Sequence, residues 1–312
     1  MNIAMINTVQ PNCGVYQYGL RVKQNLGDLI TSYHEIETMG DYTALDLSDA
    51  ELVLFNYIRT GAPDGPLAWL DDWHLARLRM QGKIPCQLYH AFPTLQFDYY
   101  FHQSPIWNNT DKVFSLPRPL PEPATSDPEM PDVPVVGSFG LANDDKNFPK
   151  IIRLVSDQFA KAKVRINFTN GYYGDASGET AKRIHDECVS TTIHSGIELE
   201  ITNRFLPESQ MVEFLRGNDL NVFMYYHDGF GGISSVIDYA IAARRPFAIG
   251  TSNMFDHIYR DEICLDRTTL PNIIEYGSKY VDELVDRYSP DAMRSAFSDA
   301  LRIIERNRYA TN

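Results

Sequence analysis

The feature that most constrains the fold is an alternation of short apolar segments with longer amphipathic segments. In the N-terminal part, segments typical of buried strands occur at residues 2–8, 51–58, 84–90 and 112–116, and segments with helical periodicity at 16–30 and 67–80. Strands that alternate with helices predict a mostly parallel sheet with helices on both faces. We therefore expect an α/β domain in this part of the chain.

The same alternation starts again in the second half of the chain. Predicted strands lie at residues 133–139, 164–169, 198–202, 220–226 and 246–250, and predicted helices at 148–162, 178–188, 208–216 and 234–243. The predicted fold class is thus α/β, with two facing Rossmann-like, doubly wound domains and a cleft between them. In such sheets, ligands bind beyond the carboxyl ends of the strands.

The two alternations are separated by residues 117–134, PRPLPEPATSDPEMPDVP, which are dense in proline. Proline cannot donate to a strand ladder and keeps the backbone extended, so we interpret this segment as the linker between domains. A long surface loop within one domain is the alternative interpretation. The expected domains are 1–125 and 126–290, both Rossmann-like, followed by a closing helix in 291–312.

Composition narrows the classes of partner. The net charge of −13 repels polyanions, and Lys and Arg are scattered along the 312 residues, which disfavours nucleic acid as a partner. No apolar stretch reaches about 18 residues, so no transmembrane segment is expected. The four cysteines form no CxxC pair, which predicts a reducing, cytoplasmic setting without disulfides or a zinc site. Oligomeric state is not readable.

A first candidate phosphate site follows the strand that starts the second alternation, in GSFGLANDDKNF. Gly137 and Gly140, on either side of Ser138, allow close approach of the backbone, and Lys146 supplies a positive charge just before a helix. A glycine turn with a lysine at a helix start suits a phosphate. The same pattern is also common as an ordinary surface turn.

A second candidate site is the glycine-rich segment HDGFGGISSVID, residues 227–238. Residues 228–232 predict a flexible turn, and Ser234 or Ser235 would cap a helix whose N–H groups attract an anion. The serines can instead be simple N-caps. Asp238 on the first turn of that helix can pair with the helix dipole, accept hydrogen bonds from sugar hydroxyls, or both.

The order and spacing of these pieces resemble the GT-B glycosyltransferases, in particular the retaining, nucleotide-sugar-dependent family of sucrose synthases and bacterial polysaccharide transferases. The matching pieces are PNCGVYQYG, GSFG with Lys146, RFLPESQMVEFLRGNDLNVFMYY and DGFGGISSVIDYAIAARRPFAIG. The sequence departs from the family where two glutamates usually flank the glycine turn. Asp228 begins that turn, Val236 takes the second place, and Asp238 follows two residues later.

The resemblance implies roles for individual residues. Gly14 would approach the donor, and His90 would lie near the transferred sugar. Lys146 would hold the diphosphate, with Arg204 as a second contact. The nucleotide base would lie against Phe205 and Leu206.

Several of these residues have other interpretations. His90 can equally be a hydrogen-bonded structural residue, with His227 as a rival. Tyr225 and Tyr226 most simply pack or line the cleft. The predicted catalytic residues are His90 and Asp228. The predicted donor-binding residues are Gly14, Gly137, Ser138, Gly140, Lys146, Arg204, Phe205, Leu206, Tyr226, Gly231, Gly232, Ser234, Ser235 and Asp238.

We expect a glycosyltransferase that moves a sugar from a nucleotide-diphosphate sugar to an acceptor hydroxyl, with retention and closure of the domains about the linker. No acid-x-acid pair lies in the glycine-rich loops and the histidines lack ligand spacing, so no metal and no cofactor are expected. A nucleotide-sugar epimerase, a catalytically degenerate nucleotide-sugar-binding protein and a transferase acting on DNA bases remain alternatives. The base, the sugar and the acceptor are not readable.

Overall fold

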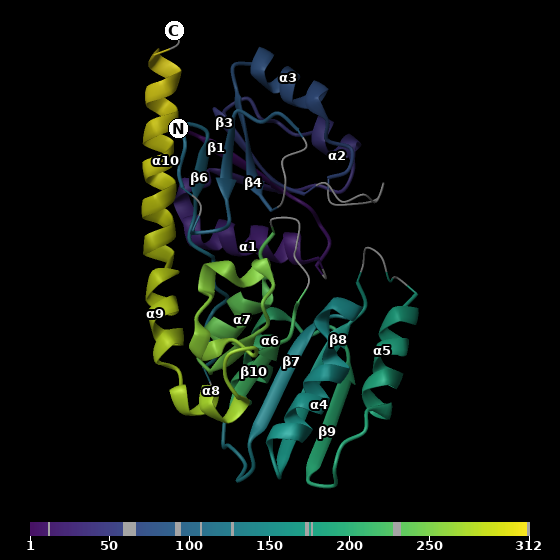
Figure 1. Cartoon of the computed structure of the whole chain (residues 1–312). Helices are drawn as coiled ribbons and strands as arrows, with labels where there is room; N and C mark the ends of the chain where they lie inside the picture. Colours follow the sequence, from purple (N-terminus) through teal and green to yellow (C-terminus); the bar gives the residue numbers. More distant parts are fainter. Residues whose placement is uncertain are drawn as a thin grey trace. The chain divides into compact units, whose positions relative to one another are not determined.

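The structure is a computed structural model in which the chain divides into two compact units (Figure 1). Unit 1 comprises Met1–Pro119, Phe230–Ile233 and Arg287–Asn312, and unit 2 comprises Leu120–Gly229 and Ser234–Asp286. The structure describes residues 1–11, 13–58, 67–90, 95–106, 108–125, 128–171, 175, 177–226 and 232–310.

Unit 1 contains a six-stranded sheet with the order β2-β1-β3-β4-β5-β6, in which all neighbouring strands are parallel. Its strands are β1 (Ile3–Asn7), β2 (Ser32–Glu35), β3 (Leu52–Tyr57), β4 (Ile84–Tyr89), β5 (Tyr99–His102) and β6 (Val113–Ser115). Its helices are α1 (Gly14–Leu26), η1 (Gly27–Leu29), α2 (Met39–Thr43), α3 (Asp72–Met80) and α10 (Pro290–Ala310).

The two faces of this sheet bury alternate residues of each strand, as the two-residue period of a strand requires. On one face, Ile3 and Leu52 pack with α1 and with four residues of α10, namely Met293, Phe297, Ala300 and Ile304. On the other face, Ala4 and Val53 pack with α2 and α3. The end of the chain therefore completes the core that its beginning starts.

Unit 2 contains a five-stranded parallel sheet with the order β11-β10-β7-β8-β9. Its strands are β7 (Val135–Leu141), β8 (Ala162–Thr169), β9 (Ile197–Asn203), β10 (Leu220–Phe223) and β11 (Phe247–Ile249). Its helical segments are η2 (Asp144–Lys146), α4 (Phe148–Gln158), α5 (Glu179–Ser190), α6 (Glu208–Arg216), α7 (Val236–Ala242), η3 (Asn253–Ile258), η4 (Asp261–Ile263), α8 (Leu270–Tyr276) and α9 (Lys279–Arg287).

Both predicted alternations are confirmed, and the fold class is the expected one of two Rossmann-like α/β sheets. Strands β2 and β5 were not predicted, because their segments SYHE and YYFH carry histidines and lack an aliphatic run. The predicted start of α3 at Leu67 was wrong. The helix begins at Asp72 because Asp71 caps it, with the Asp71 carboxylate accepting from the His74 N–H at 3.1 Å.

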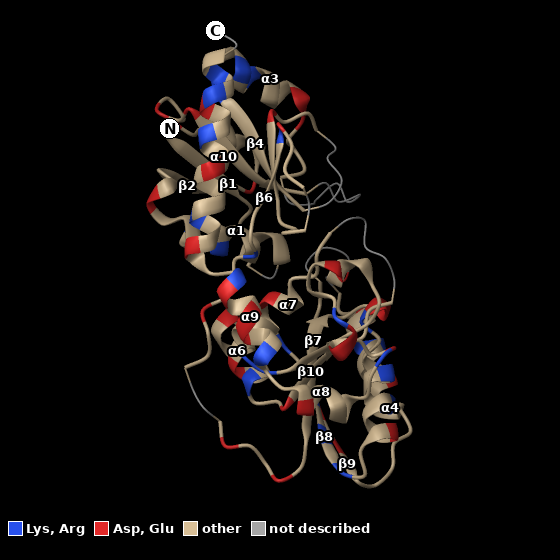
Figure 2. Ribbon diagram, turned by 60° about the vertical axis from the view of Figure 1, so that its left-hand side comes forward, with Lys and Arg blue, Asp and Glu red and all other residues tan. Residues whose placement is uncertain are grey.

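Three further properties of the described residues are relevant to function. None of their helices is both long enough and apolar enough to cross a membrane. Both acidic and basic residues occur along the helix α10 (Figure 2). All four cysteines are buried and free.

The packing of α10 predicts the effect of one substitution. Phe297 is fully buried, and its ring lies 4.8 Å from that of Phe101 on β5. We expect Phe297→Ala to lower the free energy of unfolding by about 3–5 kcal/mol, measured by urea denaturation, because it leaves a cavity. The matched control is Tyr309→Ala on the same helix, where the side chain is 79% exposed. Equal stability of the two variants would contradict this packing.

Candidate active site

The candidate site in unit 2 lies at the point where the strand order of its sheet reverses. The chain runs from β7 outward through β8 to β9, then returns to the other side of β7 with β10 and β11. Because all strands are parallel, the segments that follow β7 and β10 leave the same edge of the sheet and diverge there. Such a switch point is where open α/β sheets bind ligands.

Lys146 and Tyr225 meet at this switch point. Lys146 ends the helical turn η2 after β7, and Tyr225 follows β10. The Lys146 Nζ lies 3.8 Å from the centre of the Tyr225 ring, a cation–π contact. The Asn147 side chain donates to the Met224 carbonyl at 2.9 Å and so ties the two segments together. The position of the ammonium is thus fixed by both strands.

The charged form of Lys146 is disfavoured by its burial. Burial lowers its pKa to about 7, with the neighbouring Asp145 carboxylate opposing this weakly. Within the described residues, no carboxylate pairs with Lys146 and no acceptor bonds it; its contact is the ring face. An anion bound beside it would restore the charged form and raise its pKa.

Ser234 comes shortly before α7 and interacts with Tyr225. Burial raises the pKa of Tyr225, and a hydrogen bond with the Ser234 side chain lowers it by a smaller amount. The predicted capping role is corrected by the structure: Ser235 occupies the N-cap position of α7, but its side chain makes no capping hydrogen bond. Its backbone is already helical there, with φ −69° and ψ −7°.

Asp238 is on the first turn of α7, as expected, and is completely buried. Its backbone N–H donates to the Ser235 carbonyl at 3.1 Å. The structure therefore brings Ser234, Ser235 and Asp238 together at one helix start, near Tyr225 and Lys146.

The glycine turn after β7 has mainly packing roles in the structure. A Cβ on Gly137 would lie 2.0 Å from the Asn218 side chain, so only glycine leaves room for that amide. The Ser138 hydroxyl donates to the Val222 carbonyl at 2.7 Å and so bonds β7 to β10. Gly140 lies against Lys146, since a Cβ there would be 3.5 Å from the lysine Cε. These residues hold β7 and β10 together and leave room for Lys146 at the switch point.

The residues expected to hold the nucleotide follow β9. Arg204 and Phe205 are exposed, and Leu206 is buried. The Arg204 N–H donates to the Phe168 carbonyl at 3.1 Å, and the Arg204 carbonyl accepts from Asn167 at 3.2 Å. Tyr226 follows β10 and is 41% exposed. All of them leave the same edge of the sheet as Lys146.

In unit 1, His90 belongs to a buried polar network at the carboxyl ends of the strands. Its Nε2 lies 2.6 Å from the Asn56 Oδ1 at the end of β3, and its ring is edge-on to Tyr18 at 4.9 Å. Its carbonyl accepts from Gln103 at 3.1 Å, and Gln103 in turn accepts from the buried Arg118. The His90 side chain and its carbonyl are thus both hydrogen-bonded within unit 1.

This network fixes the tautomer of His90. The Asn56 amide nitrogen donates to the Asn7 Oδ1 at 2.7 Å and to the Val15 carbonyl at 2.6 Å. The Asn56 oxygen must then accept from His90, so the proton is on Nε2 and the lone pair is on Nδ1. Burial lowers the pKa of His90 to about 3, helped by Arg118, so the ring is neutral at physiological pH. No described residue donates to Nδ1.

Of the remaining predicted residues, the structure describes some and leaves others outside its described ranges. Gly14 is the exposed first residue of α1, after β1. Gly232, within unit 1, lies close to the backbone of His90, where a Cβ would be 3.0 Å from the His90 carbonyl oxygen. Asp228, Gly231 and the rival His227 lie outside the described residues.

The other residues of the His90 network were not predicted; they are Asn7, Asn56, Gln103 and Arg118. A signal was present for two of them, because Asn7 and Asn56 are the polar residues near the ends of otherwise apolar strands. Gly19 gives a second signal: a Cβ there would lie 2.4 Å from the Asn56 Nδ2. In the part of the chain that the structure describes, no group of three or more His, Cys, Asp or Glu side chains could hold a metal ion.

Comparison with known proteins adds to this geometry. No family model matches the sequence. No curated protein matches it either. Among solved structures, the chain is similar to Anabaena HepE in complex with UDP-glucose, with a TM-score of 0.65 and 10% identity over 97% of this chain and 99% of that one. It is also similar to the lipopolysaccharide outer core galactosyltransferase WaaB (0.58, 10%, 96% and 99%) and to the trehalose-6-phosphate synthase OtsA (0.52, 10%, 99% and 96%).

This chain has the GT-B fold. The two Rossmann-like sheets and the coverage of nearly the whole chain agree with that architecture. At 10% identity the likeness establishes the GT-B fold and leaves the activity to be argued from the site.

The neutral, buried His90 predicts a pH dependence of stability for this GT-B chain. Between about pH 3 and 6.5 the unfolded chain binds a proton on this histidine that the folded chain does not. Stability should therefore fall as the pH drops below 6.5, by at most about 1.4 kcal/mol per pH unit. We expect His90→Gln to reduce the loss between pH 7 and 5 in urea unfolding. His194→Gln, at an exposed position, should reproduce the wild-type loss. A loss in His90→Gln as large as in the wild type would contradict the assignment.

Proposed function

We propose that this protein is a glycosyltransferase that moves a sugar from a nucleotide-diphosphate sugar to the hydroxyl of an acceptor. The observation that carries the proposal is the Lys146 ammonium, held over the Tyr225 ring at the switch point of unit 2 without a carboxylate partner among the described residues. The GT-B fold supports it, since the similar HepE was crystallised with UDP-glucose and an E. coli trehalose-6-phosphate protein with UDP-2-fluoro glucose.

The proposed chemistry follows from charge development. When the glycosidic bond to the diphosphate breaks, negative charge grows on the leaving oxygen and positive charge on the sugar ring. A cation already placed beside the diphosphate stabilises that charge without the cost of reorganising solvent. Lys146 would fill this role, and Arg204 would be the second diphosphate contact. The backbone of Phe205 and Leu206 would adjoin the base.

The glycine-rich segment would complete the donor site. Ser234 is near Tyr225 and can donate its hydroxyl to the donor. Asp238, which is buried on the first turn of α7, would accept from a hydroxyl of the ribose or the sugar. Gly14, Gly231 and Gly232 would allow the backbone to approach the donor.

For unit 1, we propose that the lone pair on the His90 Nδ1 accepts a hydrogen bond from a substrate hydroxyl. The hydrogen bond from Nε2 to Asn56 holds the ring in the required tautomer. Asp228 would act on the reacting sugar as the second catalytic residue. We further propose that the transfer retains the anomeric configuration and needs no metal ion or other cofactor. The proposed location is the cytoplasm, and the four free, buried cysteines support a reducing compartment.

Lys146 provides the first test. UDP binding near pH 8 should take up about one proton, because bound diphosphate raises the lysine pKa from about 7. Calorimetry in buffers of different ionisation enthalpy measures this uptake. Lys146→Ala should abolish the uptake and weaken UDP about tenfold or more, the loss of one charge-assisted hydrogen bond. Lys150→Ala, exposed on the next helix, is the matched control. Unchanged UDP affinity in Lys146→Ala would sink the diphosphate role.

The second test is turnover. With UDP-glucose and a panel of sugar acceptors, we expect release of UDP that depends on the acceptor and persists in EDTA, and NMR of the product should show a retained anomeric configuration. Asp228→Asn should reduce turnover about tenfold or more, while the exposed Asp157→Asn should not. Binding of UDP without any turnover would instead indicate a degenerate binding protein, and an epimerised donor would indicate an epimerase.

A further inference from the structure

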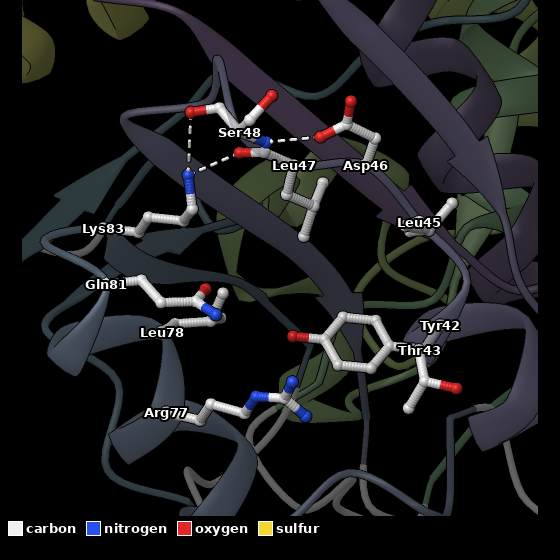
Figure 3. A pocket seen from close by; sticks show the side chains of 10 residues that line it. All are labelled: Tyr42, Thr43, Leu45, Asp46, Leu47, Ser48, Arg77, Leu78, Gln81 and Lys83. Carbon is white, nitrogen blue, oxygen red and sulfur yellow. Dashed lines mark hydrogen bonds between the residues drawn. The ribbon is translucent and has the colours of Figure 1, made fainter.

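Unit 1 contains a cavity that the proposed transfer does not use. Its volume is about 550 Å³, within the range of small-molecule sites. It lies between the connection from α2 to β3 and the second half of α3, close to the residues where β3 and β4 begin. His90 and Asn56 are at the other ends of these parallel strands. The lining residues are Tyr42, Thr43, Leu45, Asp46, Leu47, Ser48, Arg77, Leu78, Gln81 and Lys83 (Figure 3).

Tyr42 points to a ligand in this cavity. Its side chain is 8% exposed, and its ring is fixed by Trp69 at 4.8 Å and by Phe55 at 6.2 Å. Its hydroxyl extends into the cavity and makes no hydrogen bond with any described residue (Figure 3). The ring is buried while the hydroxyl opens on the cavity without a partner in the described part of the chain, so it is available to bond a ligand there.

The charge of the cavity favours an anion. Arg77 extends toward the same space as the Tyr42 hydroxyl and forms no ion pair within the described part of the chain (Figure 3). The effect of its charge on Tyr42 is to lower the pKa of that hydroxyl, against the larger opposite effect of burial.

The opposite wall holds a second cation whose hydrogen bonds are all used. The Lys83 ammonium donates to the carbonyls of Leu47, Ser48 and Ala50, the last at 2.8 Å. These bonds fix the turn but leave the positive charge without a carboxylate partner among the described residues. The acid in the lining, Asp46, is occupied by the Ser48 N–H at 2.9 Å.

The rest of the lining describes the body of the ligand. Leu45, Leu47 and Leu78 provide an apolar wall. Gln81 adds an amide that can donate, whereas the Thr43 hydroxyl already donates to the Gly40 carbonyl at 2.9 Å. The site therefore offers a planar cation, two neutral donors in the Tyr42 hydroxyl and the Gln81 amide, and an apolar surface.

We propose that this cavity binds a small organic oxyanion, a phosphate monoester or a carboxylate on an apolar body. The anion would accept from the Arg77 guanidinium and the Tyr42 hydroxyl, a geometry for which the arginine fork is suited. The apolar body would lie against the three leucines. This binding is separate from the switch point of unit 2 and does not depend on the proposed transferase activity.

The experiment is a calorimetric titration of the full chain with phenyl phosphate, benzoate and phenol. The Lys146→Ala background removes the cation of the proposed diphosphate site, so that anion binding there does not contribute to the signal. We expect at least one of the two anions to bind ten times more tightly than phenol. The same anion should raise the melting temperature, because it binds the folded state.

Two variants test the residues that carry the proposal. Arg77→Met should weaken the anion tenfold or more and leave phenol binding unchanged. Tyr42→Phe, which removes only the hydroxyl and keeps the packed ring, should weaken it by about threefold or more. Arg302→Met is the control, an arginine on α10 whose side chain is 74% exposed.

The outcomes separate clearly. Weaker binding of the anion in Arg77→Met and in Tyr42→Phe, with unchanged binding in Arg302→Met, supports the site. Anions that bind no better than phenol, or an Arg77→Met variant that behaves like Arg302→Met, would overturn it. Arg77→Met made in the wild-type chain, with Lys146 intact, should bind UDP with the wild-type affinity. The result for the cavity is then independent of the nucleotide site.

Discussion

The arrangement in unit 2 depends on one interaction, an ammonium held over an aromatic face with no carboxylate to neutralise it. Lys146 and Tyr225 come from opposite sides of the switch point, and they meet only because β7 and β10 are neighbours. The bond from Ser138 to Val222 and the room that Gly137 leaves for Asn218 hold those two strands together. Residues that look like parts of a phosphate loop in the sequence thus act mainly by positioning the cation.

At the carboxyl ends of its strands, unit 1 presents a neutral hydrogen-bond acceptor instead of a cation. Its buried cation, Arg118, is bonded to Gln103, and its histidine is neutral. The group that Asn56 leaves available is therefore a lone pair on His90, an acceptor suited to hydroxyls, whereas unit 2 offers a cation suited to phosphates. Sheets of the same architecture present different chemistry because of the few polar residues that follow their strands.

The sequence predicted the two alternations of strands and helices well, because buried parallel strands are continuous apolar runs such as LVLFNY. It also predicted that Lys146, Ser234 and Asp238 would gather after strands. It could not predict the edge strand β2, whose residues are polar enough for a loop. Nor could it predict that Tyr225 would carry the lysine or that Asn56 would set the tautomer of His90, because these depend on strand order and on pairs far apart in the chain.

The packing of α10 also has a consequence for biosynthesis. The core of unit 1 takes four side chains from a helix that leaves the ribosome after all of unit 2. Until then the face of the first sheet that carries Ile3 and Leu52 is covered by α1 but not by α10, and long-range contacts of this kind form slowly. Unit 2, apart from the short glycine-rich segment, is built from a continuous stretch of chain, so we expect it to acquire its structure earlier during translation. The nascent first sheet is then the species on which a chaperone would act.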